Sequence, residues 1–360
     1  MKIIQCIPTI AFGDAVGNDA IALKKVIEDM GYETNIYAES VVPPLGKETA
    51  LAICEIPTLM QEDIAILHLS TGAKLNYDFA EFPCRKIVIY HNITPPHYFE
   101  DNDLFIRDIN QWAIDGAKHL ADKVDYCLAD SEYNKQDLIE MGYKCPIDVL
   151  PILIPMQDYM KKPDKGILKK YEDDWINIVF TGRIVPNKCQ EDVIRAFVDY
   201  KRYFNEKSRL FLVGSYKEEN HYFQKLHKYV QQLGVKDIVF TNHVSFDAIL
   251  AYYQLADVFL CMSEHEGFCV PLVEAMLFNT PIIAYDSSAI SDTLGGSGIL
   301  IDTKAPIVVA KMIERIGKDG NLRKQVLQNQ SIRLEDFQYD KIRRKFENYI
   351  RKFIQETSGK

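Results

Sequence analysis

The chain alternates short apolar runs with segments of helical periodicity, and it does so twice, which limits the folds open to it. Six runs in the first half predict strands: residues 2–6, 33–38, 64–69, 85–90, 125–129 and 149–154. Helical spacing joins them at residues 19–30, 105–120 and 134–141. The pattern restarts with predicted strands at residues 175–180, 209–213, 238–241, 257–262, 281–285 and 298–301. Predicted helices lie between them at residues 190–204, 220–233 and 246–255. Because strands that alternate with helices build parallel sheets, we predict two doubly wound α/β domains.

The length of the chain agrees with two domains. It has 360 residues, more than the ~250–300 residues over which one hydrophobic core usually grows. A Pro- and Lys-rich stretch, residues 155–163, predicts a linker. We therefore expect a first domain at residues 1–157, a second at 165–333, and a helical segment rich in aromatic residues at 334–360.

Composition excludes several classes of protein. The net charge of −9 argues against non-specific nucleic-acid binding and leaves any anionic ligand to a local basic pocket. No run reaches the ~18 apolar residues of a membrane span. The apolar stretch at residues 1–8 is too short for a secretory signal. The eight cysteines form no C-x2-C pair, so we expect reduced thiols. We expect a cytoplasmic protein, with peripheral contact at the inner face of the membrane left open.

The stretch SEHEGFCVPLVEAM, residues 263–276, carries the sharpest functional signal. It follows a predicted strand and leads into a helix from Pro271, so the backbone N–H groups of its turn lie at a helix N-terminus, which favours anions. Glu266 lies in the turn and Glu274 about one helical turn into the helix, so both can point at one ligand. The alternative is a partly buried glutamate followed by one on a helix surface.

A second signal, TGRIVPNK at residues 181–188, follows the first strand of the second half. Gly182 allows a close backbone approach, Arg183 offers a planar fork of donors, and Lys188 adds a compact ammonium group. These groups suit a pyrophosphate.

Together the two stretches resemble motifs of the GT4 family of retaining glycosyltransferases, namely E-x7-E and G-R-x4-K. The resemblance covers nearly the whole chain and is strongest in the second half. It implies the GT-B fold: two Rossmann-like domains facing across a cleft, with a C-terminal helix that returns to the N-terminal domain. It also implies that Glu266 binds hydroxyls of the donor sugar, that Glu274 binds the ribose, and that Arg183 and Lys188 neutralise the departing diphosphate.

The same resemblance assigns further residues. His91, after the strand at 85–90, would contact the donor sugar. Ser131 and Glu132 would lie on the acceptor side, with a helix cap as the alternative. Other donor-binding positions are implied along the chain: Gly13 (or Gly17), Gly182, Val244, Gly267, Phe268, Cys269 and Val270.

Two departures from the family pattern bear on specificity. Cys269 stands where a glycine is usual after EGF, and the N-terminal loop lacks a Gly-Gly pair. Asp101 and Asp103 have D-x-D spacing, but they precede an amphipathic helix and are better explained as its N-cap than as metal ligands. We expect neither a metal nor another cofactor.

The resulting hypothesis is a retaining glycosyltransferase that moves a sugar from a UDP- or GDP-linked donor to a sugar or lipid-linked glycan acceptor. A sugar-nucleotide epimerase would use the same donor pocket without an acceptor. A non-catalytic nucleotide-sugar-binding protein would bind the donor and never turn it over. A dehydrogenase would need the glycine fingerprint of dinucleotide-binding folds, which the first turn lacks.

Overall fold

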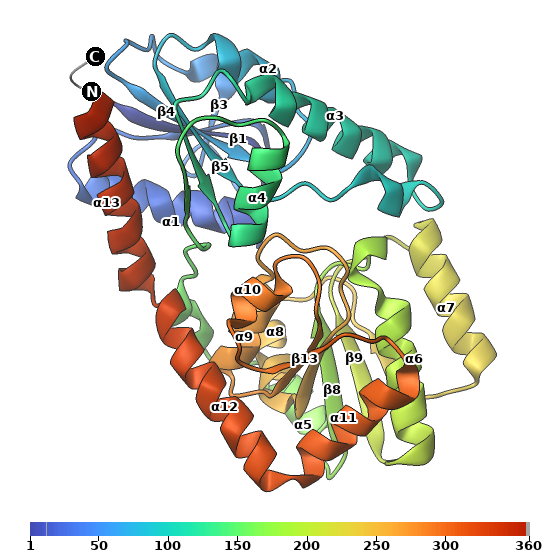
Figure 1. Ribbon diagram of the computed structural model, residues 1–360. Helices are drawn as coiled ribbons and strands as arrows, with labels where there is room; N and C mark the ends of the chain where they lie inside the picture. Colours follow the sequence, from blue (N-terminus) through green and yellow to red (C-terminus); the bar gives the residue numbers. More distant parts are fainter. Residues whose placement is uncertain (12, 358–360) are drawn as a thin grey trace. The chain divides into compact units, whose positions relative to one another are not determined.

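The computed structural model describes residues 1–11 and 13–357, which divide into two compact units (Figure 1). Unit 1 comprises Met1–His97, Phe105–Met156 and the segment from Asp336 onward; unit 2 comprises Tyr98–Leu104 and Gln157–Glu335. The sequence placed residues 98–104 in the first domain, but this segment packs on unit 2. There, Nδ1 of His221 donates to the carbonyl oxygen of Asp101 at 2.9 Å.

Unit 1 is built on a parallel sheet that has seven strands within the described residues. The strands are β1 (Ile3–Ile10), β2 (Ile36–Val41), β3 (Leu51–Ala52), β4 (Ile64–Leu69), β5 (Arg85–Tyr90), β6 (Tyr126–Ala129) and β7 (Ile147–Val149). Their order is β3-β2-β1-β4-β5-β6-β7, and every pairing is parallel. The winding therefore reverses between β1 and β4, the point at which such sheets bind ligands.

Helices cover both faces of this sheet because its strands are apolar on both sides. The helices are α1 (Ala15–Asp29), α2 (Leu75–Asp78), α3 (Leu104–Leu120), α4 (Glu132–Glu140) and α13 (Tyr339–Thr357). Within β4, Ile64 and Ile66 face the core that contains α1 and α13, while Ala65 and Leu67 face the core that contains α2, α3 and α4. In Figure 1, α13 lies on the same side of the sheet as α1. The end of the chain thus completes the core of unit 1.

The strand predicted at residues 149–154 is wrong in its position. The structure ends β7 at Val149, and Leu150 makes one further bond, from its N–H to the carbonyl of Ala129 at 2.8 Å. Pro151 follows and has no N–H to donate, so the ladder cannot continue. Instead, the N–H of Leu153 bonds to Asp19 of α1 at 2.7 Å.

Unit 2 repeats the architecture with six parallel strands among its described residues. They are β8 (Ile176–Thr181), β9 (Ser208–Val213), β10 (Ile238–Phe240), β11 (Val258–Cys261), β12 (Ile282–Tyr285) and β13 (Ile299–Ile301). The order is β10-β9-β8-β11-β12-β13, so the winding reverses between β8 and β11.

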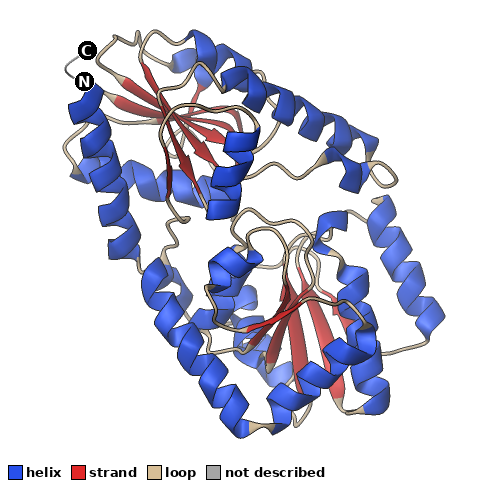
Figure 2. Cartoon of the chain, in the orientation of Figure 1, coloured by secondary structure: helices blue, strands red, loops and turns tan. Residues whose placement is uncertain are grey.

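The helices of unit 2 flank its sheet (Figure 2). They are α5 (Lys165–Lys170), α6 (Gln190–Tyr203), α7 (His221–Leu233), α8 (Phe246–Leu255), α9 (Val270–Leu277), α10 (Ile290–Leu294), α11 (Pro306–Lys318) and α12 (Gly320–Leu334). The sequence analysis proposed no element between residues 302 and 333, where α11 and α12 lie. Pro306 and Gly320 look like breakers there, but each occupies the first position of a helix, where the missing N–H or side chain costs little.

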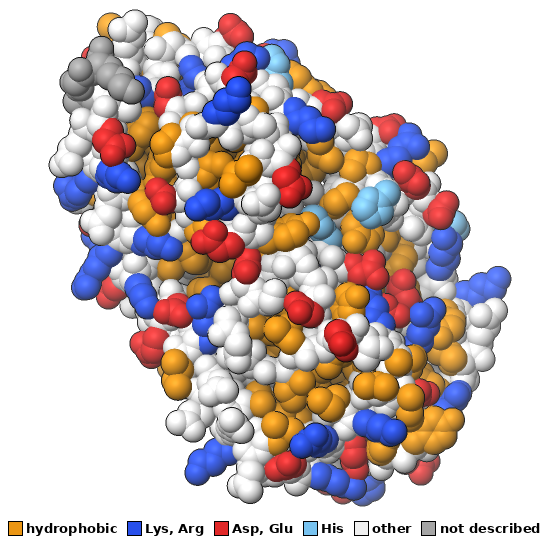
Figure 3. Space-filling model, viewed as in Figure 1, with side chains coloured by type: hydrophobic (Ala, Val, Ile, Leu, Met, Phe, Trp, Pro, Cys, Tyr) orange, Lys and Arg blue, Asp and Glu red, His pale blue; other side chains and the backbone are white. Residues whose placement is uncertain are grey.

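Short 3-10 turns complete the described elements: Ile53–Glu55, Phe79–Glu81, Pro96–Phe99, Met156–Met160, Pro186–Lys188 and Glu335–Phe337. None of the helices in the described ranges is long and apolar enough to cross a membrane. On the face drawn in Figure 3, acidic and basic side chains are interspersed.

Candidate functional site

The two motif loops of unit 2 meet at the point where the winding of its sheet reverses. Residues 182–189 follow β8 and residues 262–269 follow β11, and these strands are neighbours. In parallel sheets, the crevice beyond the carboxyl ends of two such strands is the usual ligand position. The topology therefore brings together the two segments that the sequence singled out.

A pair of glycines sets the entry to this crevice. Gly182 has φ +150° and Gly214, directly after β9, has φ +159°. A Cβ on Gly214 would lie 2.0 Å from the carbonyl oxygen of Gly182, a separation that no side chain can accept. The sequence analysis did not single out Gly214, although a glycine directly after a predicted strand was a signal for such a close approach.

Lys188 and Glu266 form an ion pair across the crevice. The ammonium nitrogen of Lys188 lies 2.6 Å from Oε1 of Glu266, and the side chains are only 13% and 11% exposed. Burial alone would lower the pKa of Lys188, but the charge of Glu266, its hydrogen bond to Lys188 and the nearby Cys269 and Cys261 together raise the pKa above its ordinary value. Lys188 is thus a fixed cation at neutral pH.

Backbone and side-chain bonds fasten the Glu266 loop. Asn187 donates from Nδ2 to the carbonyl of His265 at 2.9 Å, and its own carbonyl accepts from Glu264 N–H at 2.8 Å. On the other side, Ser288 Oγ accepts from the N–H of Glu266 at 2.8 Å. Because neighbouring loops hold it from both sides, Glu266 is positioned before any ligand arrives.

Cys269 is the last residue before α9 and adopts the left-handed conformation, with φ 67° and ψ 67°. This conformation favours glycine, which explains physically why a glycine is usual here in the family that the sequence resembles. The thiol is buried. Gly267, Phe268 and Val270 belong to the same turn, at the N-terminus of α9, as predicted from the sequence.

Glu274 is held by two tyrosines that the sequence analysis did not identify. The hydroxyl of Tyr159 donates to Oε1 and that of Tyr253 to Oε2, each at 2.6 Å. Burial raises the pKa of Glu274, and these two hydrogen bonds oppose the rise. Two donors on two different oxygens match the carboxylate form, whose remaining lone pairs can still accept from a ligand.

The other predicted residues of unit 2 lie at the same end of its sheet. Arg183 is exposed directly after Gly182. Val244 follows β10, in a loop tied to the loop after β9 by a bond from Tyr216 N–H to Asn242 Oδ1 at 3.3 Å. The donor-binding roles of these residues stay predictions.

In unit 1, His91 directly follows β5, and its contact with the donor sugar stays a prediction. The imidazole is buried, with Nδ1 3.0 Å from Asp130 Oδ2 and Nε2 2.8 Å from His68 Nδ1. Both ring nitrogens are therefore engaged inside unit 1. His68 lies in the middle of an apolar strand, and nothing in the sequence distinguished it from a core histidine.

The remaining unit 1 predictions lie in loops and caps. Gly13 has φ 76° and open space where a Cβ would be, so only its backbone demands glycine. Gly17 lies inside α1 and donates to Asp14, the cap of that helix. Ser131 caps α4 by accepting from Asn134 N–H at 3.1 Å, and Glu132 is the exposed first residue of that helix. The cap explains Ser131 without a ligand.

A cluster in unit 2 has the residue types of a metal site, but a lysine ammonium group already lies within it. Cys189, Asp192 and Glu264 bring their ligand atoms within 4.8 Å of one another. However, the Lys304 ammonium lies 3.0 Å from Asp192 and 2.7 Å from Glu264. Its charge takes the place that a cation would fill. Asp101 and Asp103 belong to no such group in the described part of the chain.

Comparison with known proteins shows what the two motif loops and the rest of unit 2 are similar to. Residues 160–332 match the family described as glycosyl transferases group 1. An uncharacterized glycosyltransferase of Methanocaldococcus jannaschii is 28% identical over 214 residues, which cover 58% of this chain and 53% of the relative. CapM, a capsular polysaccharide biosynthesis glycosyltransferase of Staphylococcus aureus, is 28% identical over 196 residues, 53% of this chain and 50% of CapM. The chain spans about half the length of these curated relatives.

Solved structures share the fold over nearly all of the chain. HepE of Anabaena, crystallised with UDP and glucose, has a TM-score of 0.77 at 16% identity and covers 98% of this chain and 100% of its own. Sucrose-phosphate synthase of Thermosynechococcus elongatus has a TM-score of 0.77 at 14% identity, with 99% and 100% covered. The predicted fold, two Rossmann-like domains of the GT-B type, is confirmed. Residues 160–332, which make up nearly all of unit 2, are thus similar to the glycosyl transferases group 1 family.

Proposed function

We propose that the chain is a retaining glycosyltransferase that moves a sugar from a nucleoside diphosphate sugar to a sugar or lipid-linked glycan acceptor. The observation that carries this proposal is the Lys188–Glu266 pair, 2.6 Å apart, where the winding of the unit 2 sheet reverses. It combines a fixed cation for a phosphate with a carboxylate for sugar hydroxyls. The N-terminus of α9 follows within four residues.

Charge on the leaving group is the main demand of this reaction. As the bond to the sugar breaks, negative charge grows on the diphosphate, and groups already aimed at it stabilise the transition state. Lys188, Arg183 and the N–H groups at the start of α9 supply positive charge. We propose that they make a metal ion unnecessary.

The way in which the two motif carboxylates are held supports retention of configuration. Glu266 is paired with Lys188, and Glu274 accepts from two tyrosine hydroxyls. Both are engaged as binding groups, whereas an inverting enzyme needs a free base aligned with the acceptor hydroxyl. In the proposed reaction the leaving phosphate accepts the acceptor's proton on the face from which it departs.

The relatives suggest the kind of pathway. CapM acts in capsular polysaccharide biosynthesis, and RfbU of Salmonella typhimurium is an O-antigen chain mannosyltransferase, 25% identical over 64% of this chain and 61% of its own. We propose a role in polysaccharide or glycoconjugate synthesis, with UDP- and GDP-linked donors both to be tested.

The test measures release of UDP or GDP from a panel of nucleotide sugars, with and without glycan acceptors. Acceptor-dependent release together with a new glycoside supports the proposal. An altered nucleotide sugar without an acceptor would instead identify an epimerase, and binding without turnover would identify a binding protein. Proton NMR of the product reads its configuration directly: from an α-linked donor, a β-linked product would refute retention.

Variants connect the activity to the site. Arg183→Ala should lower kcat/KM by about 10- to 150-fold, which corresponds to the ~1.5–3 kcal/mol of one charged hydrogen bond. Lys188→Ala should lower it at least as much. Lys207→Ala is the control, because Lys207 pairs with Asp174 at 2.6 Å on an exposed surface. Equal activity in all three variants would remove the phosphate assignment.

A further inference from the structure

A row of polar side chains crosses the apolar sheet of unit 1. Gln5 lies in β1, His68 in β4, His91 directly after β5 and Asp130 directly after β6, and these strands are consecutive neighbours in the sheet. Gln5 and His68 have no exposed surface, and Asp130 is 2% exposed. Buried polar groups are costly unless all of them are paired, so such a row needs an explanation.

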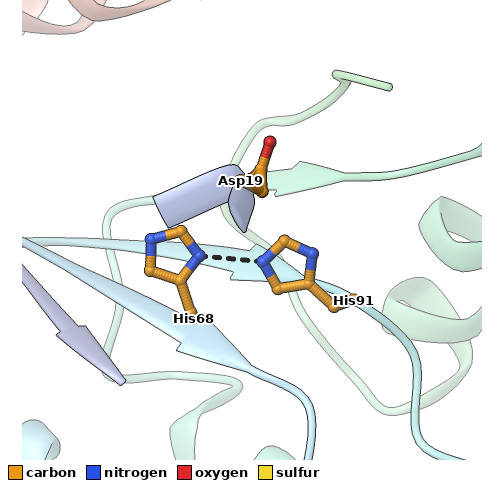
Figure 4. A group of neighbouring side chains, drawn as sticks. All are labelled: Asp19, His68 and His91. Atoms are coloured by element: carbon orange, nitrogen blue, oxygen red, sulfur yellow. Dashed lines mark hydrogen bonds between the residues drawn. The ribbon is translucent and has the colours of Figure 1, made fainter. Parts of the chain in front are cut away.

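Hydrogen bonds connect the row from end to end. His91 Nδ1 lies 3.0 Å from Asp130 Oδ2, and His91 Nε2 lies 2.8 Å from His68 Nδ1. On its far side, His68 Nε2 lies 2.9 Å from Gln5 Oε1. Gln5 ends the row by donating from Nε2 to the carbonyl of Ala20 in α1 at 3.1 Å. Figure 4 shows the two rings facing each other nitrogen to nitrogen.

The last bond fixes the direction of all the others. The carbonyl of Ala20 can only accept, so the Gln5 amide points its NH2 there and its oxygen at His68. His68 must then carry its proton on Nε2, which leaves Nδ1 as a bare acceptor. His91 Nε2 must therefore carry a proton, which it donates to His68.

The other nitrogen of His91 faces a carboxylate. Two arrangements make this hydrogen bond possible. Nδ1 carries a proton and donates it to the Asp130 carboxylate, or Nδ1 accepts from a protonated Asp130 carboxyl group. Either way, the His91–Asp130 pair holds one proton more than a neutral imidazole beside a carboxylate. Burial lowers the pKa of His91, but the charge and hydrogen bond of Asp130, together with the charges of Asp19 and Asp14, more than reverse this, and the net pKa is raised. Burial, and to a smaller extent the positive charge of His91, lower the pKa of His68. The His68 ring is therefore neutral.

From this chain of bonds we propose that Gln5, His68 and Asp130 are positioning residues that lock His91 in one orientation and hold it as an imidazolium ion. The row does not conduct protons, because it ends on a backbone carbonyl that cannot take one up. Its effect on catalysis rests on the function proposed above together with the contact between His91 and the donor sugar that the sequence resemblance implies.

The same atoms could be mistaken for a metal site, since Asp19, His68 and His91 bring ligand atoms within 4.8 Å of one another. Two imidazole nitrogens on a tetrahedral zinc ion, each ~2.0–2.1 Å from it, stand about 3.3 Å apart. Here they are 2.8 Å apart, the length of a hydrogen bond. The distance favours a shared proton.

The charged groups around His91 bear on its titration. Asp130 lies beyond β6, and Asp14 and Asp19 belong to the α1 region; all three favour the protonated ring, while neutral His68 faces it from β4. Burial is the main reason that the pKa of Asp19 rises to about 7. Loss of the Asp19 proton above neutral pH therefore strengthens the hold on the His91 proton.

The first test is NMR of the intact protein with 13C- and 15N-labelled histidine, assigned with His68→Asn and His91→Asn. The expected result is a doubly protonated His91 and a His68 with its proton on Nε2, both unchanged from pH 6 to pH 8. A neutral His91 at pH 7 would overturn the proposal. So would equimolar Zn²⁺ that shifts both histidine signals, since it would establish a metal site.

The second test uses Asp130→Asn with Asp148→Asn as its control, because Asp148 accepts from Tyr126 at 2.6 Å in the same unit. Removing the Asp130 charge should lower the pKa of His91 by about 1–3 units. If turnover needs the cation, kcat of Asp130→Asn should fall about tenfold or more between pH 6 and pH 8, relative to Asp148→Asn. A parallel pH profile in the two variants would overturn the positioning role. The NMR result requires no activity, so it stands apart from failure of the proposed function.

Discussion

The two tyrosines on Glu274 allow a stability prediction from geometry alone. Tyr159→Phe and Tyr253→Phe each remove one hydroxyl that donates to the buried carboxylate at 2.6 Å. The rings should keep their packing, since Tyr159 contacts Phe246 edge-on at 5.2 Å and Tyr253 stacks on Phe278 at 5.4 Å. The measured change therefore isolates the hydrogen bond.

The expected loss is about 1.5–3 kcal/mol for each variant, because a carboxylate that loses a donor in a buried site is not rehydrated. For a unit of this size, that corresponds to a decrease in Tm of about 3–12 °C. Thermal unfolding followed by circular dichroism at pH 7.5 measures it. If Glu274 binds the ribose, calorimetric titration should also show weaker UDP or GDP binding in both variants.

Tyr252→Phe is the matched control. Tyr252 lies next to Tyr253 on α8 and is also buried. Its ring packs against the ring of Phe211, with centroids 5.0 Å apart, and not against Glu274. Should both test variants unfold within about 1 °C of this control, the two hydrogen bonds would contribute nothing measurable. The account of Glu274 as a carboxylate held by two donors would then be refuted.

Three further predictions concern backbone, charge and metal. Gly214→Ala should lower the free energy of unfolding by about 3 kcal/mol or more, because its Cβ would collide with the Gly182 carbonyl. The control Gly234→Ala, at φ 61° with open space around the Cβ, should lower it by only ~1–2 kcal/mol. Equal losses in urea unfolding would contradict the clash. Burial raises the pKa of Glu274 above its value in the unfolded chain, so the native state holds that proton to higher pH and wild-type stability falls as pH rises from about 4.5 through the folded pKa. Glu274→Gln lacks this term, so its stability relative to wild type should improve across that window, and a pH-independent difference would argue against the raised pKa. Transfer activity should persist in EDTA and change little on adding Mg²⁺ or Mn²⁺; activity lost to chelation and restored by one ion would refute the metal-free proposal.

Strand positions in both units could be predicted because apolar runs at the correct length repeat along the chain. The strands β4 and β5 have the bounds that the pattern predicts. The strand expected at 149–154 was misplaced because apolar periodicity does not register the missing N–H of Pro151. Tertiary packing, rather than any local signal, decides that residues 98–104 fold with unit 2.

The residues of the candidate site likewise divide into those that the sequence could indicate and those that it could not. The residues in the loops after β8 and β11 could be found from sequence because they lie in contiguous motifs. Tyr159 and Tyr253 could not, since each reaches the site from an element remote in sequence. The sequence predicts His91 as a site residue, but not the bonds that its buried ring makes with His68 in β4 and with Asp130 after β6. One sequence cannot indicate such contacts between distant segments.

The placement of α13 has a consequence for how the chain is made. Ile342, Phe346 and Ile350 belong to the core of unit 1, yet the ribosome adds them only after all of unit 2. The sheet of unit 1 must therefore wait, with one face incompletely covered, while residues 157–335 emerge. Domains usually fold in the order of their synthesis, but here the first unit to appear is the last to be completed. A chain that ends before residue 342 would thus hold a complete unit 2 and an unfinished unit 1, the state most exposed to chaperones and proteases.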